Sequence, residues 1–304
     1  MERILFMLAV LPTIILGAFI YKNDKLEKEP ASLLLSLGAA GIGSAILTLV
    51  LTYVLGAIIP FFASEYYTSF SALELAIYVF VGVALIEEFS KWIFTYIIAW
   101  KNKEFNHVYD AIVYCVFVSL GFATIENILY VFGSESVGSA FFTAFNRMIF
   151  SVPGHAFFGV LMGYYLGLAK LTNFNGKKEK SIKYLLLSVL VPTICHFLFD
   201  YLLMINLEYS FLLFIIFVVI MFSIAISKVK RLSNIPTNIF NKPQRMDYIY
   251  NAFGNNNYNQ NNNYTYNNYN YQNNNQVYSQ RRICKNCGKE VTGKFCSNCG
   301  KEYN

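Results

Sequence analysis

Residues 72–100 read ALELAIYVFVGVALIEEFSKWIFTYIIAW, an apolar run that contains three acids and one lysine. A helix needs about 20 mostly apolar residues to cross the hydrocarbon core of a bilayer, so this run is long enough to span a membrane. The whole chain of 304 residues agrees, because 56% of it is hydrophobic and only 14% is charged. A soluble domain is usually about one quarter charged. The composition therefore excludes an ordinary soluble enzyme and predicts a membrane protein.

Further apolar runs lie on both sides of this one. The predicted membrane spans are residues 4–20, 31–59, 72–100, 108–132, 139–169, 184–204 and 209–227. The run 139–169 contains Arg147 and Pro153, so an interfacial helix up to about Phe150 followed by a span from near Ser151 is an alternative. The predicted fold class is an all-α polytopic membrane protein with about seven transmembrane helices and a small C-terminal zinc ribbon.

Lysine and arginine occur only in alternate loops. Thirteen of them lie in loops 21–30, 101–107 and 170–183 and just after the last span, and none lies in loops 60–71, 133–138 and 205–208. Loops rich in these residues face the cytoplasm, so we expect a multi-pass protein of the cell membrane with its N-terminus outside and its C-terminus in the cytoplasm. Reading the first run as a cleaved signal peptide would place three lysines outside, which disfavours that alternative.

The part of the chain after the last span divides into a linker, 228–280, and a zinc ribbon, 281–304, which follow the transmembrane domain 1–227. Residues 251–280 contain 14 Asn, 6 Tyr and 4 Gln and no charge, a composition that predicts a disordered cytoplasmic tether. The ribbon carries C-x2-C-x8-C-x2-C, formed by Cys284, Cys287, Cys296 and Cys299.

Two cysteine pairs at this spacing predict a structural zinc site with four thiolate ligands. A pair of disulfides is the alternative, and the reducing cytoplasm disfavours it. We expect the ribbon to bind a cytoplasmic protein whose identity the sequence does not indicate. We expect no nucleic-acid partner. Cys115 and Cys195 lie inside spans and are interpreted as packing residues.

Ionisable residues lie inside four of the spans. They are Glu87, Glu88 and Lys91, then Glu126, then His155, then His196 and Asp200. Each unpaired charge at bilayer depth costs about 2.5–3.5 kcal/mol, so four acids and a lysine would together cost roughly 12–17 kcal/mol. We therefore expect these groups to be paired, neutralised or solvated in a shared cavity.

The positions of these residues along the spans predict that they meet. At about 1.5 Å per residue, Glu88, Glu126, His155 and His196 all lie roughly 20–24 Å from the cytoplasmic boundary. Helical spacing also puts Phe122 on the face of Glu126 and Asp200 on the face of His196, and it lets Lys91 reach Glu87 or Glu88. Such a set of carboxylates and histidines can perform acid–base chemistry on a water molecule.

Glycines recur every four residues after His155, at Gly159, Gly163 and Gly167. Small residues at this spacing let a second helix approach closely, so we interpret them as a packing stripe. His107 stands at a membrane boundary and is interpreted as an interfacial residue.

The motifs Glu87-Glu88-x-x-Lys91, Phe122-x-x-x-Glu126-Asn127, His155-x-x-x-Gly159 and His196-x-x-x-Asp200 follow one another on successive spans. In this order they resemble the PrsW family of intramembrane proteases, which is related to the CAAX-processing and bacteriocin-processing proteases. The resemblance covers about residues 1–227, and Asp110 also fits the family's pattern. A single one of these motifs would be weak, because Glu-Glu-x-x-Lys is common on soluble helices.

The resemblance implies a peptidase of the glutamic intramembrane type that cleaves a membrane-tethered protein. The family's role suggests an anti-sigma factor as substrate, cut at the first site of a regulated proteolytic cascade. Glu87 or Glu88 would activate water, the second-motif residue, here Glu126, would help orient it, and His196 would stabilise the oxyanion. His155 would belong to the same catalytic set. Lys91, Phe122, Asn127 and Asp200 would support them. Glu126 stands where the CAAX branch has histidine, so the division of roles is open.

The need for a catalytic metal ion and the function itself each leave an alternative open. The resemblance implies a metal-independent or metal-assisted enzyme, and we expect no catalytic metal, although three acids and two histidines are groups that can bind a divalent ion. The main alternative function is an ion or proton-coupled transporter, because the same residues form proton and cation relays. A membrane scaffold whose zinc ribbon recruits a partner is a third hypothesis.

Overall fold

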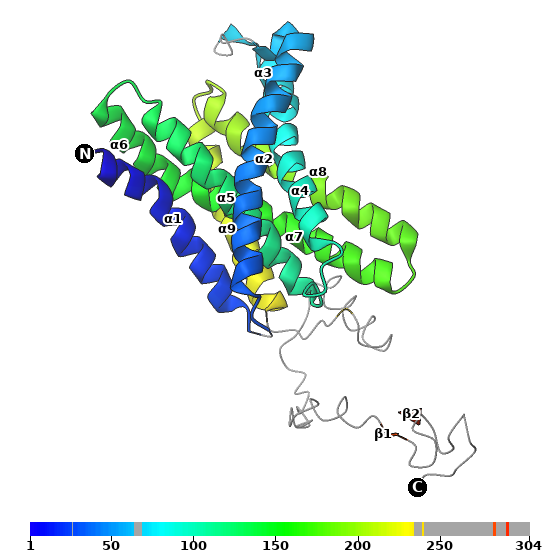
Figure 1. The fold of residues 1–304 in the computed structure, drawn as a ribbon. Coiled ribbons are helices and arrows are strands. Elements are labelled where there is room, and N and C mark those ends of the chain that lie inside the picture. The colour runs from blue at the N-terminus through cyan, green and yellow to red at the C-terminus, as the bar shows by residue number, and fades with distance from the viewer. Residues whose placement is uncertain (26, 64–68, 234–238, 240–281, 284–289, 292–304) are drawn as a thin grey trace. The chain divides into compact units, whose positions relative to one another are not determined.

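The computed structural model describes residues 1–25, 27–63, 69–233, 239, 282–283 and 290–291 (Figure 1). The chain forms two units, Met1–Ile249 and Tyr250–Asn304. The described elements of the first unit are all helical, and the described residues of the second form two short paired strands.

The helices of the first unit follow the predicted spans closely. They are α1 (Glu2–Asn23), α2 (Ala31–Ile58), η1 (Pro60–Ala63), α3 (Ala72–Ile77), η3 (Tyr78–Leu85), α4 (Ile86–Ala99), α5 (Val108–Phe132), α6 (Val137–Asn146), η4 (Arg147–Ser151), α7 (Val152–Phe174), α8 (Lys178–Met204) and α9 (Ser210–Leu232). Within the described residues, six helical segments are long and apolar enough to cross a membrane. The predicted all-α polytopic fold is therefore confirmed.

The seventh predicted span, residues 72–100, is helical from Ala72 to Ala99 but is divided into α3, η3 and α4. Its middle part, η3, is a π-helix, and so is η4 between α6 and α7. Residues 137–174 accordingly form one continuous helical segment that changes its hydrogen-bonding pattern at Arg147–Ser151, close to the predicted division near Ser151. Both π-helical turns directly precede helices that carry the polar residues, a placement that is common near functional sites.

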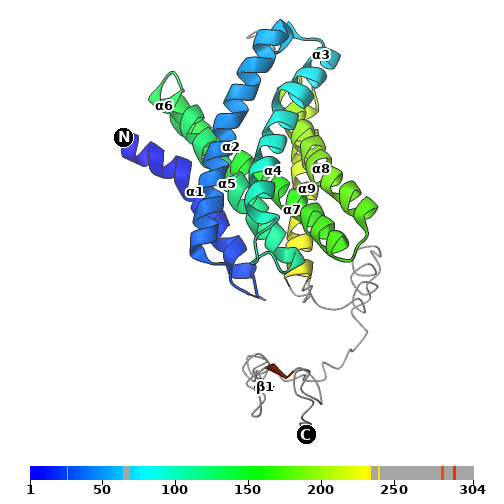
Figure 2. The same ribbon diagram turned by 45° about the vertical axis from the view of Figure 1, so that its right-hand side comes forward.

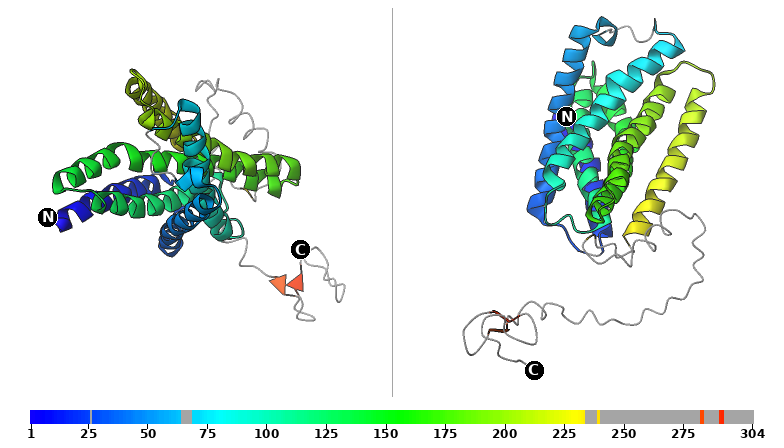
Figure 3. Two further views of the ribbon diagram at one scale, coloured as in Figure 1. Left: turned by 90° about the horizontal axis from the view of Figure 1, so that it is seen from above. Right: turned by 90° about the vertical axis from the view of Figure 1, so that its right-hand side faces the viewer.

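Helices α5 and α7 form the centre of the first unit, with the other helices packed around them (Figures 2 and 3). The predicted glycine stripe lies in their contact. A Cβ atom at Gly163 would lie 2.4 Å from Ile112 Cα, and one at Gly167 would lie 2.6 Å from the Val108 carbonyl oxygen. Because only glycine leaves room for this approach, the stripe sets the spacing between the two helices.

Large apolar side chains cover the outside of the peripheral helices. Tyr53 and Ile58 on α2 and Phe211 on α9 are among those more than half exposed. An exposed apolar surface of this extent is unfavourable in water and suits the hydrocarbon interior of a bilayer. Cys115 is buried and Cys195 is half-buried, as expected for packing residues.

The second unit contains strands β1 (Arg282–Ile283) and β2 (Glu290–Val291), which pair antiparallel with Arg282 opposite Val291. These strands stand on either side of Cys284 and Cys287 in the sequence. The four cysteines predicted to bind zinc (Cys284, Cys287, Cys296 and Cys299) lie outside the described residues, and so does the predicted tether, 251–280.

Candidate active site

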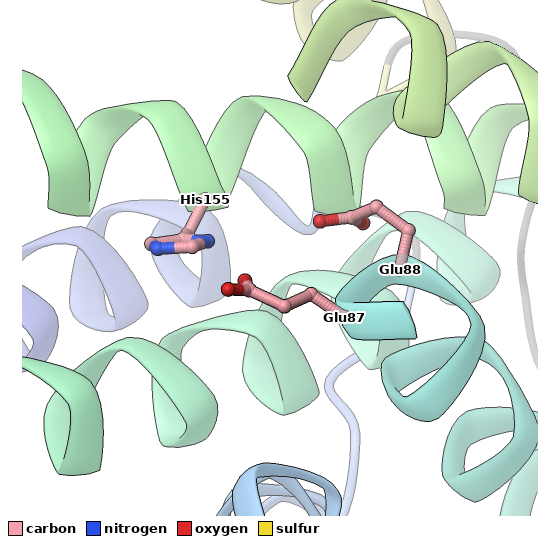
Figure 4. A group of neighbouring side chains, drawn as sticks. All are labelled: Glu87, Glu88 and His155. Carbon is pink, nitrogen blue, oxygen red and sulfur yellow. The ribbon is translucent and has the colours of Figure 1, made fainter. Parts of the chain in front are cut away.

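Four helices and one π-helical turn bring polar side chains together inside the first unit. Glu87, Glu88 and Lys91 lie on the first turns of α4, and His155 lies on the first turn of α7. Figure 4 shows both glutamates reaching from α4 toward the His155 ring. The other members come from α5, η4 and α8. We call this set the cavity cluster, and its members are Glu87, Glu88, Lys91, Glu126, Arg147, His155, His196 and Asp200.

Lys91 lies at the centre of the cavity cluster and is fully buried. Its Nζ atom is 2.8 Å from Glu88 Oε1, 3.3 Å from Glu87 Oε2 and 3.1 Å from His155 Nδ1. The Phe122 ring closes the fourth side, with its centroid 4.0 Å from Nζ. Lys91 thus reaches both glutamates, and it also reaches a histidine 64 positions away in the chain.

His196 lies between two carboxylates. Its Nδ1 is 2.9 Å from Glu88 Oε1, and its Nε2 is 3.2 Å from Asp200 Oδ2 and 3.9 Å from Glu87 Oε2. The Phe158 ring stacks on the imidazole with a centroid distance of 4.6 Å. Since both ring nitrogens face carboxylate oxygens, His196 can donate from both nitrogens when it carries two protons.

Glu126 is held from two sides. His155 Nε2 and Arg147 Nη2 each lie 2.7 Å from Glu126 Oε2. Arg147 Nε also donates to Asn127 Oδ1 at 2.7 Å, and its guanidinium lies over the Tyr130 ring. One cation therefore positions both polar residues of the second motif.

A cavity of about 640 Å³ adjoins the cavity cluster. The charged and histidine side chains that line it are Glu87, Glu126, Arg147, His155, His196 and Asp200. Glu88 and Lys91 are not among its lining residues and are 0% exposed, whereas the Glu87 side chain is 10% exposed. The two adjacent glutamates therefore differ: Glu87 faces the cavity, and Glu88 lies behind it between Lys91 and His196.

The cavity extends toward one end of the first unit. Phe142 of α6, Met204 at the end of α8 and Phe211 at the start of α9 also line it. These residues stand next to the loops 133–136 and 205–209, which contain no lysine or arginine. The cavity therefore lies toward the end of the helices where the charge pattern predicts the outside of the cell.

The predicted supporting residues occupy distinct positions around the cavity cluster. Phe122 packs against Lys91 and His155, and Asp200 contacts His196. Asn127 links α5 to α1 by donating from Nδ2 to the Ala9 carbonyl oxygen at 3.0 Å. Asp110 lies apart from this group at the start of α5, where its carboxylate accepts hydrogen bonds from two backbone amides.

Arg147 is a member of the cavity cluster that the sequence interpretation did not include. A charged arginine inside an apolar run costs free energy at bilayer depth, as Glu126 does. The sequence therefore already indicated that Arg147 needs a polar partner. It was interpreted instead as a sign that the span 139–169 was interrupted. The two interpretations are compatible, because Arg147 opens the π-helical turn η4 and also pairs with Glu126.

The fold and this site define a class of protein: a polytopic helical membrane protein with a buried carboxylate–histidine centre beside a cavity. Residues 29–226 match the family described as "PrsW family intramembrane metalloprotease". The chain belongs to this family of intramembrane proteases, so the recognised resemblance is confirmed and the protein is a membrane-embedded peptidase.

Relatives named "Protease PrsW" support this membership. The chain is 34% identical to the protein of Clostridioides difficile over 240 residues, which cover 79% of this chain and 96% of the relative. It is 36% identical to the protein of Oceanobacillus iheyensis over 73% of this chain and 93% of the relative. It is 33% identical to the protein of Bacillus subtilis over 68% of this chain and 87% of the relative. No solved structure matches the chain.

The family description raises the question of whether the cavity cluster fits a metal ion. Glu87, Glu88 and His155 each offer one ligand atom, and these atoms lie within 4.8 Å of one another. Carboxylate and imidazole are suitable ligands for zinc. However, the Lys91 ammonium contacts all three residues, so the set does not fit a metal ion while Lys91 remains in place.

Proposed function

We propose that the protein hydrolyses a peptide bond in a membrane-tethered protein, with Glu87 as the group that activates water. The observation that carries this proposal is the different exposure of the two adjacent glutamates. Glu87 lines the cavity where a substrate segment and water would meet, and Glu88 is enclosed by Lys91 and His196. A general base has to reach the proton that it removes, and only Glu87 of this pair has that access.

The other residues of the cavity cluster take roles that follow from their contacts. His196 Nε2 lies 3.2 Å from Asp200 Oδ2 and 3.9 Å from Glu87 Oε2, and its N–H would turn from Asp200 to the oxygen that becomes negatively charged when water attacks the carbonyl carbon. Glu87 would then pass the proton it accepted to the leaving amine. Glu88 would orient His196 through Nδ1, and Arg147 would fix Glu126, which orients His155.

The substrate class follows from the position of the cavity. The cavity lies toward the end of the helices that is predicted to face outside, and it is lined by apolar side chains from α6, α8 and α9. This arrangement favours a substrate cut at or just outside the outer half of its membrane span. We propose an anti-sigma factor as the physiological substrate, and the support for this is family membership. The same membership favours a peptidase over the transporter alternative.

The zinc ribbon remains part of this proposal. Cys284, Cys287, Cys296 and Cys299 would hold a structural zinc ion, and the folded ribbon would bind a cytoplasmic protein. Zinc content of the full chain before and after replacement of the four cysteines by serine would test the metal site.

The proposed roles of the two glutamates are tested by comparing Glu87→Gln with Glu88→Gln. Glu87→Gln should abolish cleavage of a co-expressed single-span substrate and lower thermal stability less than Glu88→Gln does, because Glu87 is the more distant partner of Lys91 and faces the cavity. Glu88→Gln should also lower stability, by up to about 3–5 kcal/mol, because it leaves the buried Lys91 without its nearest anionic partner. Unchanged cleavage by Glu87→Gln would refute the role of Glu87.

The substrate itself is sought by comparing membrane proteomes of wild-type and Glu87→Gln cells. The expected result is one single-span protein whose outer domain is shed only by the wild type. Shedding of the same proteins in both strains would contradict the proposal.

A further inference from the structure

The Lys91 ammonium occupies the position between the three ligand groups where a metal ion would bind. An ammonium carries three N–H donors, and three acceptor atoms surround this one: Glu88 Oε1, His155 Nδ1 and Glu87 Oε2. The three distances, 2.8, 3.1 and 3.3 Å, are hydrogen-bond lengths. Zinc would need its nitrogen and oxygen ligands at about 2.0–2.2 Å. The spacing therefore suits an ammonium rather than a metal ion.

The surroundings of His155 complete the same pattern. Because Nδ1 accepts from Lys91, Nε2 carries the ring hydrogen and donates it to Glu126 Oε2 at 2.7 Å. In metal sites a ligating histidine typically binds the ion through one nitrogen and donates from the other to a carboxylate. In this protein, His155 donates from Nε2 to the Glu126 carboxylate in the same way. Its Nδ1 faces the Lys91 ammonium where a metal site would have the ion.

The fourth side of Lys91 is closed by an aromatic ring. The Phe122 ring centroid lies 4.0 Å from Nζ, a geometry that stabilises an ammonium through the electron-rich face of the ring. A catalytic metal ion needs an open coordination position for water or substrate at this point. Lys91 is also fully buried, so its charge is balanced by Glu87 and Glu88 rather than by solvent.

We propose that the Lys91 ammonium takes the place of a catalytic metal ion in this chain, so that Lys91 and a divalent ion exclude each other from the Glu87–Glu88–His155 set. Two cations cannot share this position, because they would lie within about 1–2 Å of each other with no solvent between them. This inference concerns what the set binds, so it stands whether or not Glu87 is the base that activates water.

The first experiment measures metal binding to the full-length protein purified in detergent, with Ser in place of Cys284, Cys287, Cys296 and Cys299 so that the ribbon contributes no signal. After equilibrium dialysis against Co²⁺, this protein should hold well below one Co²⁺ ion per chain. One tightly bound Co²⁺ per chain that is lost in Glu87→Ala or His155→Ala would overturn the proposal. This measurement requires no change at Lys91.

The second experiment removes the ammonium. In the same background, Lys91→Met keeps the length of the side chain and frees the three ligand groups. It should gain about one Co²⁺ per chain, seen by metal analysis and by the visible absorption of the bound ion, and adding His155→Ala should remove that gain. Lys101→Met, at an exposed lysine after α4, is the control and should gain none. Absence of any gain in folded Lys91→Met would contradict the exclusion.

Discussion

Two groups of buried acids in the same helical unit have different partners. The cavity cluster combines carboxylates with Lys91, Arg147 and two histidines. The second group, which we call the loop cluster, lies at the ends of the helices near the lysine-rich loops, and its members are Glu29, His107, Asp110 and Tyr114. In the loop cluster the carboxylates accept hydrogen bonds from neutral donors. Tyr114 Oη lies 2.7 Å from Glu29, and the Asn106 and His107 amides lie 2.9 and 2.6 Å from Asp110.

The different partners indicate different roles for the two groups of buried acids: the loop cluster holds the fold together, and the cavity cluster can take part in proton transfer. Neutral donors fix a carboxylate and, at Asp110, complete the start of α5, but no member of the loop cluster lines the cavity. The cavity cluster sets ionisable groups of both signs beside a cavity, where a proton can move to and from water. Burial alone therefore does not identify a catalytic acid, whereas its partners and its access to a cavity do.

A large difference in cleavage rate is expected between histidine variants of the two clusters. His196→Ala should lower substrate cleavage by about 10²–10³-fold, the usual effect of removing a donor to a developing oxyanion. His107→Ala should leave cleavage within about threefold, because His107 belongs to the loop cluster and does not line the cavity. Cleavage rates of both purified variants, measured with the same single-span substrate, check this. Similar losses in the two variants would remove the distinction between the clusters.

A smaller effect is expected at the contact between α5 and α7. Gly163→Ala places a methyl group 2.4 Å from Ile112 Cα, which should destabilise the protein by about 1–3 kcal/mol. It should also lower cleavage, because separating α5 from α7 moves His155 away from Glu126. Gly38→Ala meets nothing within 4 Å and is the control. Thermal unfolding and cleavage rates measure both effects, and equal stability of the two variants would contradict the packing argument.

The smallest effect concerns the pH dependence of the loop cluster. Burial raises the pKa of Glu29 from 4.5 to about 7. The folded protein then holds a proton that the unfolded chain has lost between these values, so Glu29 lowers stability as the pH rises from about 4.5 to about 7. Glu29→Gln should remove this decline, so Tm at pH 8 should rise, and it should leave cleavage unchanged. An unchanged decline of stability with pH in the variant would refute the assignment.

Most of the fold could be predicted from hydropathy, because a bilayer requires long apolar helices and the chain has them. The alternation of lysine between loops predicts which helix ends face the cytoplasm, and that orientation stays a prediction. The π-helical turns at Tyr78–Leu85 and Arg147–Ser151 could not be predicted, because their hydrogen-bonding shift leaves no pattern in composition.

Most members of the cavity cluster could be predicted from the free-energy cost of burying a charge in the bilayer, but the role of each residue could not. Glu87 and Glu88 are adjacent on one helix, and both can reach Lys91, so spacing could not distinguish them. The distinction depends on where α8 places His196 and on which side the cavity lies. Arg147 could have been included by the same cost argument. The four tail cysteines remain a sequence prediction.

The central claim is that the carboxylate facing the cavity activates water for peptide hydrolysis. Its most direct test is the cleavage rate of a single-span protein by the purified enzyme in liposomes, compared among wild type, Glu87→Gln and Glu29→Gln. We expect a loss of about 10²–10⁴-fold for Glu87→Gln and a rate within about threefold of wild type for Glu29→Gln. A Glu87→Gln enzyme that cleaves at the wild-type rate would contradict it.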